Sequence, residues 1–412
     1  HRAGRDGTML ALLFLDLDLF KNVNDTLGHP VGDALLQSVA NAMADALPDA
    51  DSIARLGGDE FIVLLEDMGE PTNAAQLART LLEVFSQPFP AQDRELHITA
   101  SIGISVFPVD GKDMDALLAN ADVAMYRAKE QGRNTYRFFK PEMTAGAAER
   151  LRLENALRGA LARDELKLEY QPQVRLDDSC MYGAEVLVRW HHPELGIVPP
   201  ARFIPIAEEL GLIVDLGAWV LARACRQLAA WDARGLLVPR LAVNLSVLQL
   251  ERPSLVEEVD AAVQESGIEP NRLELEVTES MLMRHAEQVI ANLAALRDMG
   301  ITIAVDDFGS GFSSLAYLKR LPIHRLKIDK VFVDHLTANV NDDAIARAVI
   351  ALGRGLGLEV IAEGVETEVQ ADFLRREGCA EAQGFLFGRP MSAAELEAFV
   401  ADGGAVQLKP EA

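Results

Sequence analysis

Two adjacent acids, Asp306 and Asp307, stand where an apolar run ends in the second half of the chain. The run from Ile301 to Val305 is typical of a buried strand, and Phe308-Gly309-Ser310-Gly311 is typical of a loop. Two neighbouring carboxylates at the mouth of a hydrophobic strand are costly unless positive charge holds them, and a metal ion is the usual solution. The alternative is a strand end at which the two acids only cap a turn in solvent.

Other apolar runs of this half end in the same kinds of side chain. These are Glu185, Asn244, Glu276, Lys327 with Asp329, Glu363 and Gln383. In a barrel of strands that alternate with helices, the C-terminal ends of the strands converge on one face. Carboxylates gathered there without cations would repel one another, so the set predicts divalent metal. Oxygen ligands, with neither Cys nor His among them, favour Mg²⁺ or Mn²⁺ over Zn²⁺.

The apolar runs that carry these residues alternate with amphipathic helices. The expected strands are 166–171, 181–189, 240–245, 273–277, 301–306, 325–328, 359–362 and a short one near 382–383. The expected helices include 217–235, 287–299 and 343–356. About eight strand–helix units of this length favour a TIM-like (β/α)8 barrel. An open doubly wound sheet would carry a glycine-rich phosphate turn after its first strand, and the sequence has none there.

The first half predicts a different architecture, an α+β sandwich. A strand over 9–15 ends in Asp16-Leu17-Asp18, and strands 52–56 and 61–65 flank Gly57-Gly58-Asp59-Glu60 as a hairpin. The remaining expected elements are helices 31–46, 72–86 and 114–131 and strands 96–106 and 135–139. Asp16 and Asp59 are expected to meet from adjacent strands, where a metal ion would bridge them to phosphate oxygens. The alternative is that these acids are hairpin-turn residues.

The composition excludes some partners and compartments. The formal net charge of −24 argues against a nucleic-acid polymer as partner, because such surfaces are basic. The cysteines Cys180, Cys225 and Cys379 fit no metal-ligand spacing or disulfide framework, which favours a reducing, cytoplasmic location. No apolar run reaches membrane-spanning length, and no signal peptide is evident. Residues 1–8 read as a chain cut in the middle, so we expect a longer parent protein with upstream sensory or membrane segments outside this sequence.

The segment Arg55-Leu56-Gly57-Gly58-Asp59-Glu60-Phe61 resembles the signature of the GGDEF domain, the diguanylate cyclase family. The likeness runs over residues 9–140 and includes an Asp-x-Asp-x-Phe-Lys-x-x-Asn-Asp segment and Ala128-Lys129-Glu130-Gln131-Gly132-Arg133-Asn134. The family joins two GTP molecules into cyclic di-GMP across a dimer. The resemblance implies that Asp16 and Asp59 hold Mg²⁺ with Glu60 beside them. It also implies that Asn24 and Asp33 bind guanine and that Lys129 and Arg133 hold the phosphates of GTP.

This half departs from the family in two places. Nothing in His1 to Leu10 matches the family's Asp-x-Leu-Thr-Gly-Leu-x-Asn-Arg segment, so we expect a domain truncated at its start. The truncation weakens the case for cyclase activity. The inhibitory Arg-x-x-Asp site of many members corresponds to Pro48-Asp49-Ala50-Asp51 here, and without the arginine we expect no such product site.

The second half resembles the EAL family of cyclic di-GMP phosphodiesterases over residues 151–400. The segments that carry the likeness are 170–172, 185–190, 244–246, 274–279, 306–311, 327–329, 363–366 and 383–384. The signature reads Glu185-Val186-Leu187, with Val in place of Ala, which should leave Glu185 able to reach metal. The resemblance implies two Mg²⁺ or Mn²⁺ ions, which can stabilise both attacking and leaving oxygens.

The same resemblance implies a role for each residue. The metal ligands would be Glu185, Asn244, Glu276, Asp306, Asp307, Glu363 and Gln383. Glu185, Lys327, Asp306, Asp307 and Glu363 would be catalytic, with Lys327 orienting water or neutralising charge. Gln171 and Arg189 would hold the substrate, and Glu279 and Glu366 would support the loop from Gly309 to Ser314 or the metals. That loop is the expected moving part, and both acids of Asp306-Asp307 can face the site only if the strand ends by Asp306.

The sequence therefore predicts an α/β multidomain protein. The expected parts are a truncated GGDEF domain (1–140), a helical linker or start of the next domain (141–163) and an EAL barrel (164–405). The leading hypothesis is metal-dependent hydrolysis of cyclic di-GMP to linear pGpG, with GTP bound by the first domain and a homodimer as the working form. The alternatives are a bifunctional enzyme that also makes cyclic di-GMP, and a receptor that binds it without turnover.

Overall fold

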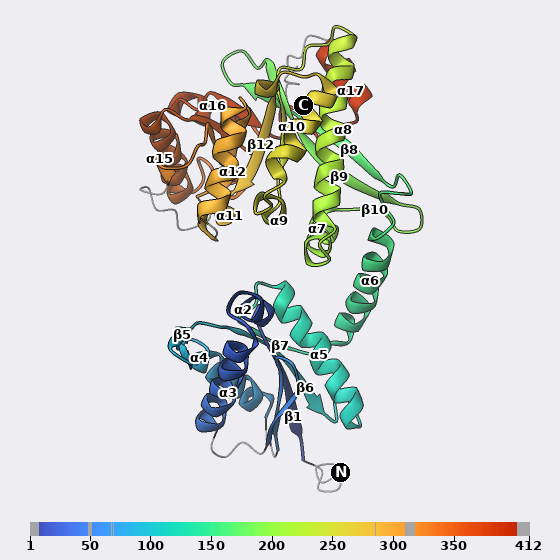
Figure 1. The fold of residues 1–412 in the computed structure, drawn as a ribbon, viewed down its shortest axis with the longest axis vertical. Coiled ribbons are helices and arrows are strands. Elements are labelled where there is room, and N and C mark those ends of the chain that lie inside the picture. The colour runs from blue at the N-terminus through green and yellow to red at the C-terminus, as the bar shows by residue number, and fades with distance from the viewer. Residues whose placement is uncertain are drawn as a thin grey trace. The chain divides into compact units, whose positions relative to one another are not determined.

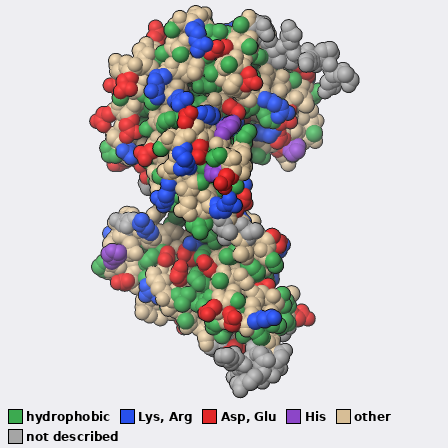
Figure 2. Space-filling view, turned by 90° about the vertical axis from the view of Figure 1, so that its right-hand side faces the viewer, with side chains coloured by type: hydrophobic (Ala, Val, Ile, Leu, Met, Phe, Trp, Pro, Cys, Tyr) green, Lys and Arg blue, Asp and Glu red, His purple; other side chains and the backbone are tan. Residues whose placement is uncertain are grey.

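The computed structural model describes residues 8–47, 52–66, 68, 70–284, 286–309 and 318–401. The chain divides into two compact units, His1–Arg152 and Leu153–Ala412. Each unit has its own hydrophobic core. Among the described residues, no helix is long and apolar enough to cross a membrane. On the face drawn in Figure 2, acidic and basic side chains are interspersed.

The first unit is built on a five-stranded sheet in the order β2-β3-β1-β6-β7. The strands are β1 (Leu10–Leu17), β2 (Ser52–Gly57), β3 (Glu60–Leu65), β6 (Ala100–Phe107) and β7 (Tyr136–Phe138). The central strand β1 pairs antiparallel with β3 and β6, and its register sets Asp16 opposite Glu60. The short hairpin of β4 (Phe89–Ala91) and β5 (Arg94–Leu96) forms a separate ribbon. The single strand expected over 96–106 is therefore the end of β5 and, after a break, β6.

Helices cover both faces of this sheet, because β1 is apolar on both sides (Figure 1). Its odd-numbered residues pack with α3 (His29–Ala46) and α4 (Pro71–Val84), while Leu12 and Phe14 pack with α5 (Met114–Glu130). The short helix α2 (Phe20–Leu27) follows β1. Its Phe20 also belongs to the α3 side of the core. Together these elements give the α+β unit that the sequence predicted.

The second unit is a closed eight-stranded barrel. Its strands are β8 (Leu166–Arg175), β9 (Met181–His192), β11 (Leu241–Asn244), β12 (Leu273–Thr278), β13 (Thr302–Phe308), β14 (Arg325–Ile328), β15 (Glu359–Ala362) and β16 (Glu381–Gln383). Strands β9 and β11 to β16 run parallel, and β8 closes the ring by pairing antiparallel with both β9 and β16. The predicted TIM-like barrel is confirmed, but not as eight strand–helix units. Strands β8 and β9 form a hairpin, to which β10 (Gly196–Val198) is added at the outer edge.

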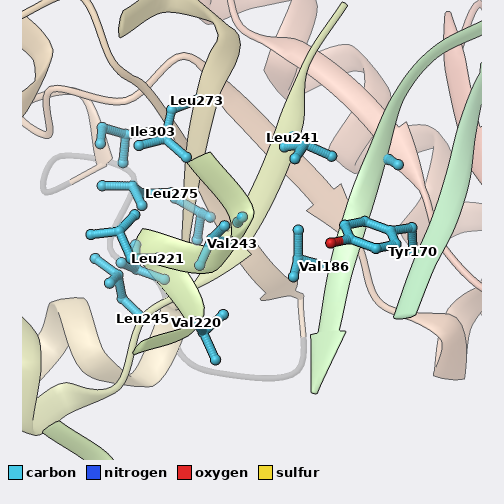
Figure 3. Packing of buried hydrophobic residues seen from close by; sticks show 14 of the residues in the cluster. Tyr170, Val186, Val220, Leu221, Leu241, Val243, Leu245, Leu273, Leu275 and Ile303 are labelled. Carbon is cyan, nitrogen blue, oxygen red and sulfur yellow. The ribbon is translucent and has the colours of Figure 1, made fainter. Parts of the chain in front are cut away.

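Helices surround the barrel, as Figure 1 shows. They are α7 (Pro200–Glu209), α8 (Ile213–Ala233), α9 (Val247–Leu250), α10 (Leu255–Ser266), α11 (Glu279–Arg284), α12 (Ala286–Asp298), α14 (Lys330–Val333), α15 (Val340–Leu356), α16 (Glu368–Glu377) and α17 (Ala393–Ala401). In Figure 3, Val220 and Leu221 of α8 lie against Val243 and Leu245 of the β11 segment. This packing fixes the end of β11, and with it the neighbouring Asn244.

Helix α6 (Pro141–Leu157) covers most of the expected linker. In the first unit, its Arg150 lies 4.7 Å from the centroid of the Tyr126 ring. In the second unit, Leu153 and Leu157 are buried in the barrel's core. Helix α6 therefore contains residues of both units, and the expected role of this stretch as a linker stays a prediction.

A network of charges fills the barrel at the N-terminal ends of its strands. Arg325, the first residue of β14, is 1% exposed and its guanidinium stacks 5.0 Å from the Tyr182 ring centroid. Its nitrogens lie 2.6 Å from Glu359, 2.9 Å from Glu381 and 3.5 Å from Glu274. Burial lowers the pKa of Arg325, but these neighbours outweigh burial and hold its pKa above the usual range. The arginine therefore links strands β12, β14, β15 and β16 at the end opposite the carboxylates considered next.

Candidate active site

Lys327 is fully buried inside the barrel and is surrounded by acids. The carboxylate oxygens near its Nζ belong to Glu363 (2.5 Å), Glu276 (2.7 Å), Asp306 (3.3 Å) and Glu185 (3.9 Å). These residues come from β9, β12, β13 and the end of β15, so four segments far apart in sequence meet at one amine. Burial lowers the pKa of Lys327, but the four carboxylates outweigh burial and hold its pKa well above its usual value.

Burial raises the pKa of three acids of this cluster. Burial raises the pKa of Glu276 well above its usual value, and Lys327 opposes that shift only in part. Burial likewise raises the pKa of Glu363. For Asp307, burial and then the charge of Asp306 raise the pKa to about 6. A divalent cation at this cluster would favour the charged carboxylates and offset these shifts.

The donor set fits a divalent metal ion. One carboxylate oxygen each from Asp306, Asp307 and Glu363 lie within 4.8 Å of one another. Oε1 of Glu276 is buried, and no described residue donates a hydrogen bond to it. A buried carboxylate oxygen without a donor is costly, and an ion would satisfy it. All of these atoms are hard oxygen donors, which Mg²⁺ and Mn²⁺ prefer.

Asp306 and Asp307 share the site because β13 is irregular. The strand continues to Phe308, so it does not end by Asp306 as the sequence argument required. Instead, its pairing with β14 shifts between Val305 and Phe308, and Asp307 adopts a left-handed backbone with φ of 54°. A bulge of this kind interrupts the alternation of side chains, so both acids can face the cluster.

Amide side chains hold Glu185 in place. Asn244 Nδ2 donates to Glu185 Oε1 (2.8 Å), and Gln383 Nε2 donates to Glu185 Oε2 (2.6 Å). The Nδ2 of Asn244 makes this hydrogen bond, so its Oδ1 remains suited to bind a metal ion. The Oε1 of Gln383 instead accepts a hydrogen bond from Gln173 Nε2 (3.0 Å). Gln383 also donates to Gln171 Oε1 (3.0 Å), and Gln171 donates to the Gly388 carbonyl (3.1 Å). This arrangement favours Gln383 and Gln171 as positioning residues for Glu185.

The other expected residues of this unit lie in three different settings. Arg189 donates from Nε to Glu169 (2.8 Å) and from NH1 to the Val188 carbonyl (3.0 Å). Glu279 is buried and its Oε2 accepts from the Gly309 amide (3.0 Å), which anchors the end of β13. Glu366 pairs with Lys330 (2.6 Å), and the ion pairs around Lys327 within the described residues do not include it. Of the loop expected to move, residues 310–314 lie outside the described residues.

The first unit brings a second set of acids together. Asp16, at the end of β1, lies 2.7 Å from Lys129 Nζ. Burial is the main cause that raises the pKa of Asp16 to about 6, with smaller contributions from Asp59 and Asp18. Arg55 donates twice to the Gly58 carbonyl (2.9 and 2.7 Å), which braces the hairpin that carries Asp59. Asp16, Asp59 and Lys129 are therefore neighbours.

The residues expected to bind guanine lie beside α3. A cavity of about 450 Å³ is lined by Asp33, Gln37, Arg55 and Phe61, among others. Asn24 packs on Gly32, where an added Cβ would meet its Oδ1 at 2.0 Å. Glu60 is opposite Asp16 in the sheet, while Arg133 is exposed on the turn after α5. Residues 48–51, where the inhibitory arginine is missing, lie outside the described residues.

Sequence reasoning missed two residues that organise these sites. Asp18 is buried and accepts hydrogen bonds from Thr99, Ser101 and the Asn134 amide (2.7, 2.7 and 3.1 Å). It ties β1 to the turn that carries Arg133. Gln173 holds Gln383 from the neighbouring strand. Each lies two positions after an expected site residue, Asp18 after Asp16 and Gln173 after Gln171. Residues two apart in an extended segment lie on the same side, so this spacing could have identified them.

Two family models match this chain. The EAL domain matches residues 154–390, and the diguanylate cyclase GGDEF domain matches residues 1–135. The bifunctional diguanylate cyclase/cyclic di-GMP phosphodiesterase MucR of Pseudomonas aeruginosa is 50% identical over 97% of this chain and 58% of its own length. Cyclic di-GMP phosphodiesterase NbdA of the same organism is 44% identical over 96% of this chain and 50% of its own length. The chain thus spans about half the length of the curated relatives it matches.

Solved structures resemble the chain as well. The PaMucR phosphodiesterase in complex with c-di-GMP is 49% identical, with a TM-score of 0.58 over 60% of this chain and 99% of that one. The S helix-GGDEF-EAL portion of Vibrio cholerae LapD, bound to c-di-GMP, gives a TM-score of 0.61 over 93% of this chain and 90% of that one. At 20% identity, this second likeness concerns the fold alone.

Proposed function

Because the chain belongs to the family of tandem GGDEF–EAL proteins, we propose that its second unit hydrolyses cyclic di-GMP to linear pGpG with the help of divalent metal. The observation that carries the proposal is the convergence of Glu185, Glu276, Asp306 and Glu363 on the buried Lys327. A receptor that only binds the dinucleotide would not need these buried acids, since each is costly to keep. The phosphodiesterase names of relatives such as NbdA support the same reading.

Two Mg²⁺ or Mn²⁺ ions would be held by Glu185, Asn244, Glu276, Asp306, Asp307 and Glu363. When bound, they would supply Lewis acidity toward a phosphoryl oxygen and toward the attacking water. Gln383, Gln171 and Gln173 keep Glu185 in the required orientation. Glu279 fixes the backbone beside Asp307 through Gly309.

The chain's own groups then complete the reaction. Water adds to phosphorus in line with the 3′ oxygen, the P–O3′ bond breaks, and the proton of the water passes to a carboxylate of the cluster. The 3′ oxygen leaves and takes up a proton, which gives linear pGpG. The ammonium of Lys327 stabilises the negative charge that develops at the phosphoryl group. Arg189 uses Nε and NH1 in its hydrogen bonds to Glu169 and to the Val188 carbonyl. Its NH2 group is suited to bind a phosphate oxygen.

A product assay tests this proposal. Purified protein is incubated with cyclic di-GMP and Mg²⁺ or Mn²⁺, and pGpG is followed by chromatography. We expect pGpG from the wild type and at least a hundredfold loss in Glu185→Ala, because the carboxylate held by Asn244 and Gln383 is removed. Binding of cyclic di-GMP without product would instead identify a receptor. Full activity in Glu185→Ala would disprove the site assignment.

For the first unit, we propose GTP binding with Mg²⁺ at Asp16 and Asp59, phosphates at Lys129 and Arg133, and guanine near Asn24 and Asp33. The ion pair of Asp16 with Lys129 and the cavity beside Asp33 support this reading. A bifunctional enzyme remains the second candidate, favoured by the intact hairpin motif and by the name of the relative MucR. Formation of cyclic di-GMP from GTP would establish it. We further propose a homodimer as the working form, which light scattering would test.

A further inference from the structure

A second layer of polar side chains lies inside the barrel, below the candidate active site. Its members Gln173 and Glu274 are fully buried, and each stands two positions along its strand from a residue that we assign to the site. Residues two apart in a strand lie on the same side of a sheet, so both side chains point into the barrel. Figure 3 agrees, because Leu273 and Leu275, on either side of Glu274, pack in the cluster that contains Leu221 of α8.

The amide chain that holds Glu185 can run in one direction only. An ionised carboxylate accepts hydrogen bonds and donates none, so Gln383 turns its Nε2 toward Glu185 Oε2 (2.6 Å). This orientation turns Gln383 Oε1 toward Gln173, whose Nε2 donates to it (3.0 Å). The Oε1 of Gln173 therefore stands at the end of the chain as an acceptor. It is buried, and no described residue donates a hydrogen bond to it. A buried oxygen in this setting needs a donor.

Gly183 leaves room for such a donor. It stands opposite Gln173 in the pairing of β8 with β9, and an added Cβ would lie 3.1 Å from Gln173 Oε1 and 3.1 Å from the Arg240 carbonyl oxygen. Both oxygens therefore border the space beside Gly183. On the next strand, the fully buried Ala242 stands opposite Glu274 and adds only a methyl group. A space bordered by a glycine and an alanine, and lined with polar atoms, suits a water molecule.

Glu274 brings a second buried oxygen to this layer. Its Oε2 accepts from Arg240 NH1 (3.1 Å) and lies 3.5 Å from Arg325 NH1, while no described residue donates to its Oε1. The Nε of Arg325 is also buried, and no described residue accepts its proton. A buried water makes about three hydrogen bonds as donor and acceptor, so water can serve these two oxygens and this N–H together. The two guanidinium groups beside Glu274 disfavour a further cation.

We propose that ordered water binds in this layer and donates hydrogen bonds to Gln173 Oε1 and Glu274 Oε1. Through Gln173, the water holds the amide chain in the direction that Glu185 requires, so Gln173 and Gly183 are positioning residues for that carboxylate. The water also joins the chain to Glu274, whose other oxygen belongs to the network around Arg325. The site follows from the buried groups alone, whereas its effect on Glu185 as a metal ligand rests on the proposed function.

A crystal structure of the full chain, at a resolution that shows individual waters, tests the site directly. We expect density for water within hydrogen-bond distance of Gln173 Oε1 and of Glu274 Oε1, from one molecule or from two in contact. Crystals grown in rubidium chloride distinguish water from an alkali cation, because rubidium scatters anomalously. A rubidium peak between the two oxygens, or no density beside either one of them, would overturn the inference.

Gly183→Ala tests what the water does. The added methyl contacts Gln173 Oε1 and takes the space of the water. We expect the affinity for Mn²⁺, measured by calorimetry, to fall about 10-fold, because partners behind a metal ligand commonly contribute this much. Gly355→Ala, at an exposed glycine with no atom near an added Cβ, is the matched control and should keep the wild-type affinity. Unchanged affinity in Gly183→Ala would contradict the positioning role.

A second variant, Gln173→Leu, removes the same oxygen from the other side. It should lower the Mn²⁺ affinity by a similar factor, and Gly183→Ala/Gln173→Leu should lower it little further, since both changes interrupt one chain. Fully additive losses would contradict a shared water. Thermal unfolding verifies the fold, and the wild-type crystal structure decides the site if a variant does not fold. If the wild type forms no pGpG, the proposed function fails, while the density beside Gln173 still decides this inference.

Discussion

Lys327 supplies the positive charge that lets four acids share the interior of one barrel. Its amine is 2.5 Å from Glu363 and 2.7 Å from Glu276, distances typical of charge-assisted hydrogen bonds. Because Lys327 is fully buried, solvent screens these interactions little. Removing the amine would leave buried charges without compensation, which is among the most destabilising single changes in a protein.

Replacing Lys327 with methionine is therefore expected to couple stability to metal. The side-chain length is kept while the charge is lost, so the metal-free variant should lose about 3–5 kcal/mol of unfolding free energy. Added Mn²⁺ should raise the melting temperature more in Lys327→Met than in the wild type, because binding to the folded state stabilises it. Differential scanning calorimetry with and without Mn²⁺ measures both. Lys330→Met, at a half-exposed lysine outside the cluster, is the control, and equal shifts in the two variants would contradict the prediction.

At the scale of the elements, strands β12, β14, β15 and β16 each carry two separate groups of functional side chains, one at each end. Toward their C-terminal ends lie Glu276, Lys327, Glu363 and Gln383 of the candidate active site, while their N-terminal ends hold the network around Arg325. Strands of three or four residues, such as β14 and β16, have few backbone hydrogen bonds with which to fix their register. The arginine adds side-chain contacts across four strands and so supports the geometry at the far end.

Arg325→Met should unfold the barrel more easily without touching the site. We expect a loss of about 3–5 kcal/mol in urea unfolding, since Glu359 and Glu381 would lose their contacts with the guanidinium and the buried Glu274 would keep only Arg240. The double variant Arg325→Met/Glu274→Gln should recover part of that loss, because one of the three acids around the missing guanidinium is then uncharged. Arg347→Met, which removes a surface pair with Glu377, should cost less than about 1 kcal/mol. Equal costs for Arg325→Met and Arg347→Met would refute the role of the network.

The sequence predicted the element types well and the irregular features less well. Apolar runs located all eight barrel strands, and both family resemblances are confirmed. Periodicity could not show that β8 pairs antiparallel with two neighbours, because strand direction depends on contacts far apart in the chain. The bulge at Asp307 was missed for a similar reason, since it depends on the register between β13 and β14. The roles expected of single site residues, such as Glu366, stay predictions until activity is measured.

At the scale of the whole molecule, the chain holds separate hydrophobic cores for its two units. A core that is complete within one unit can unfold on its own, so changes inside each unit should act locally. In the first unit, α5 crosses β6 at Gly103, where an added Cβ would lie 1.9 Å from the Ala121 carbonyl oxygen. In the second, Gly355 lies on the exposed surface of α15 with no atom near an added Cβ.

Two glycine substitutions should therefore move different unfolding transitions. Gly103→Ala should destabilise the first unit by about 1–3 kcal/mol through overpacking. Gly355→Ala should stabilise the second by up to about 1 kcal/mol through helix propensity. Calorimetry of the intact chain is expected to show each variant shifting one transition and leaving the other in place. A single transition that moves in both variants would show that the units unfold together.

The buried Lys327 also affects the order in which the barrel folds and binds metal. A site made only of carboxylates would have to wait for divalent ions before its barrel could close around them. Here the chain carries its own cation into the interior. The barrel can therefore fold before any metal binds, and under the proposed mechanism a shortage of metal would leave a folded but inactive protein rather than an unfolded one.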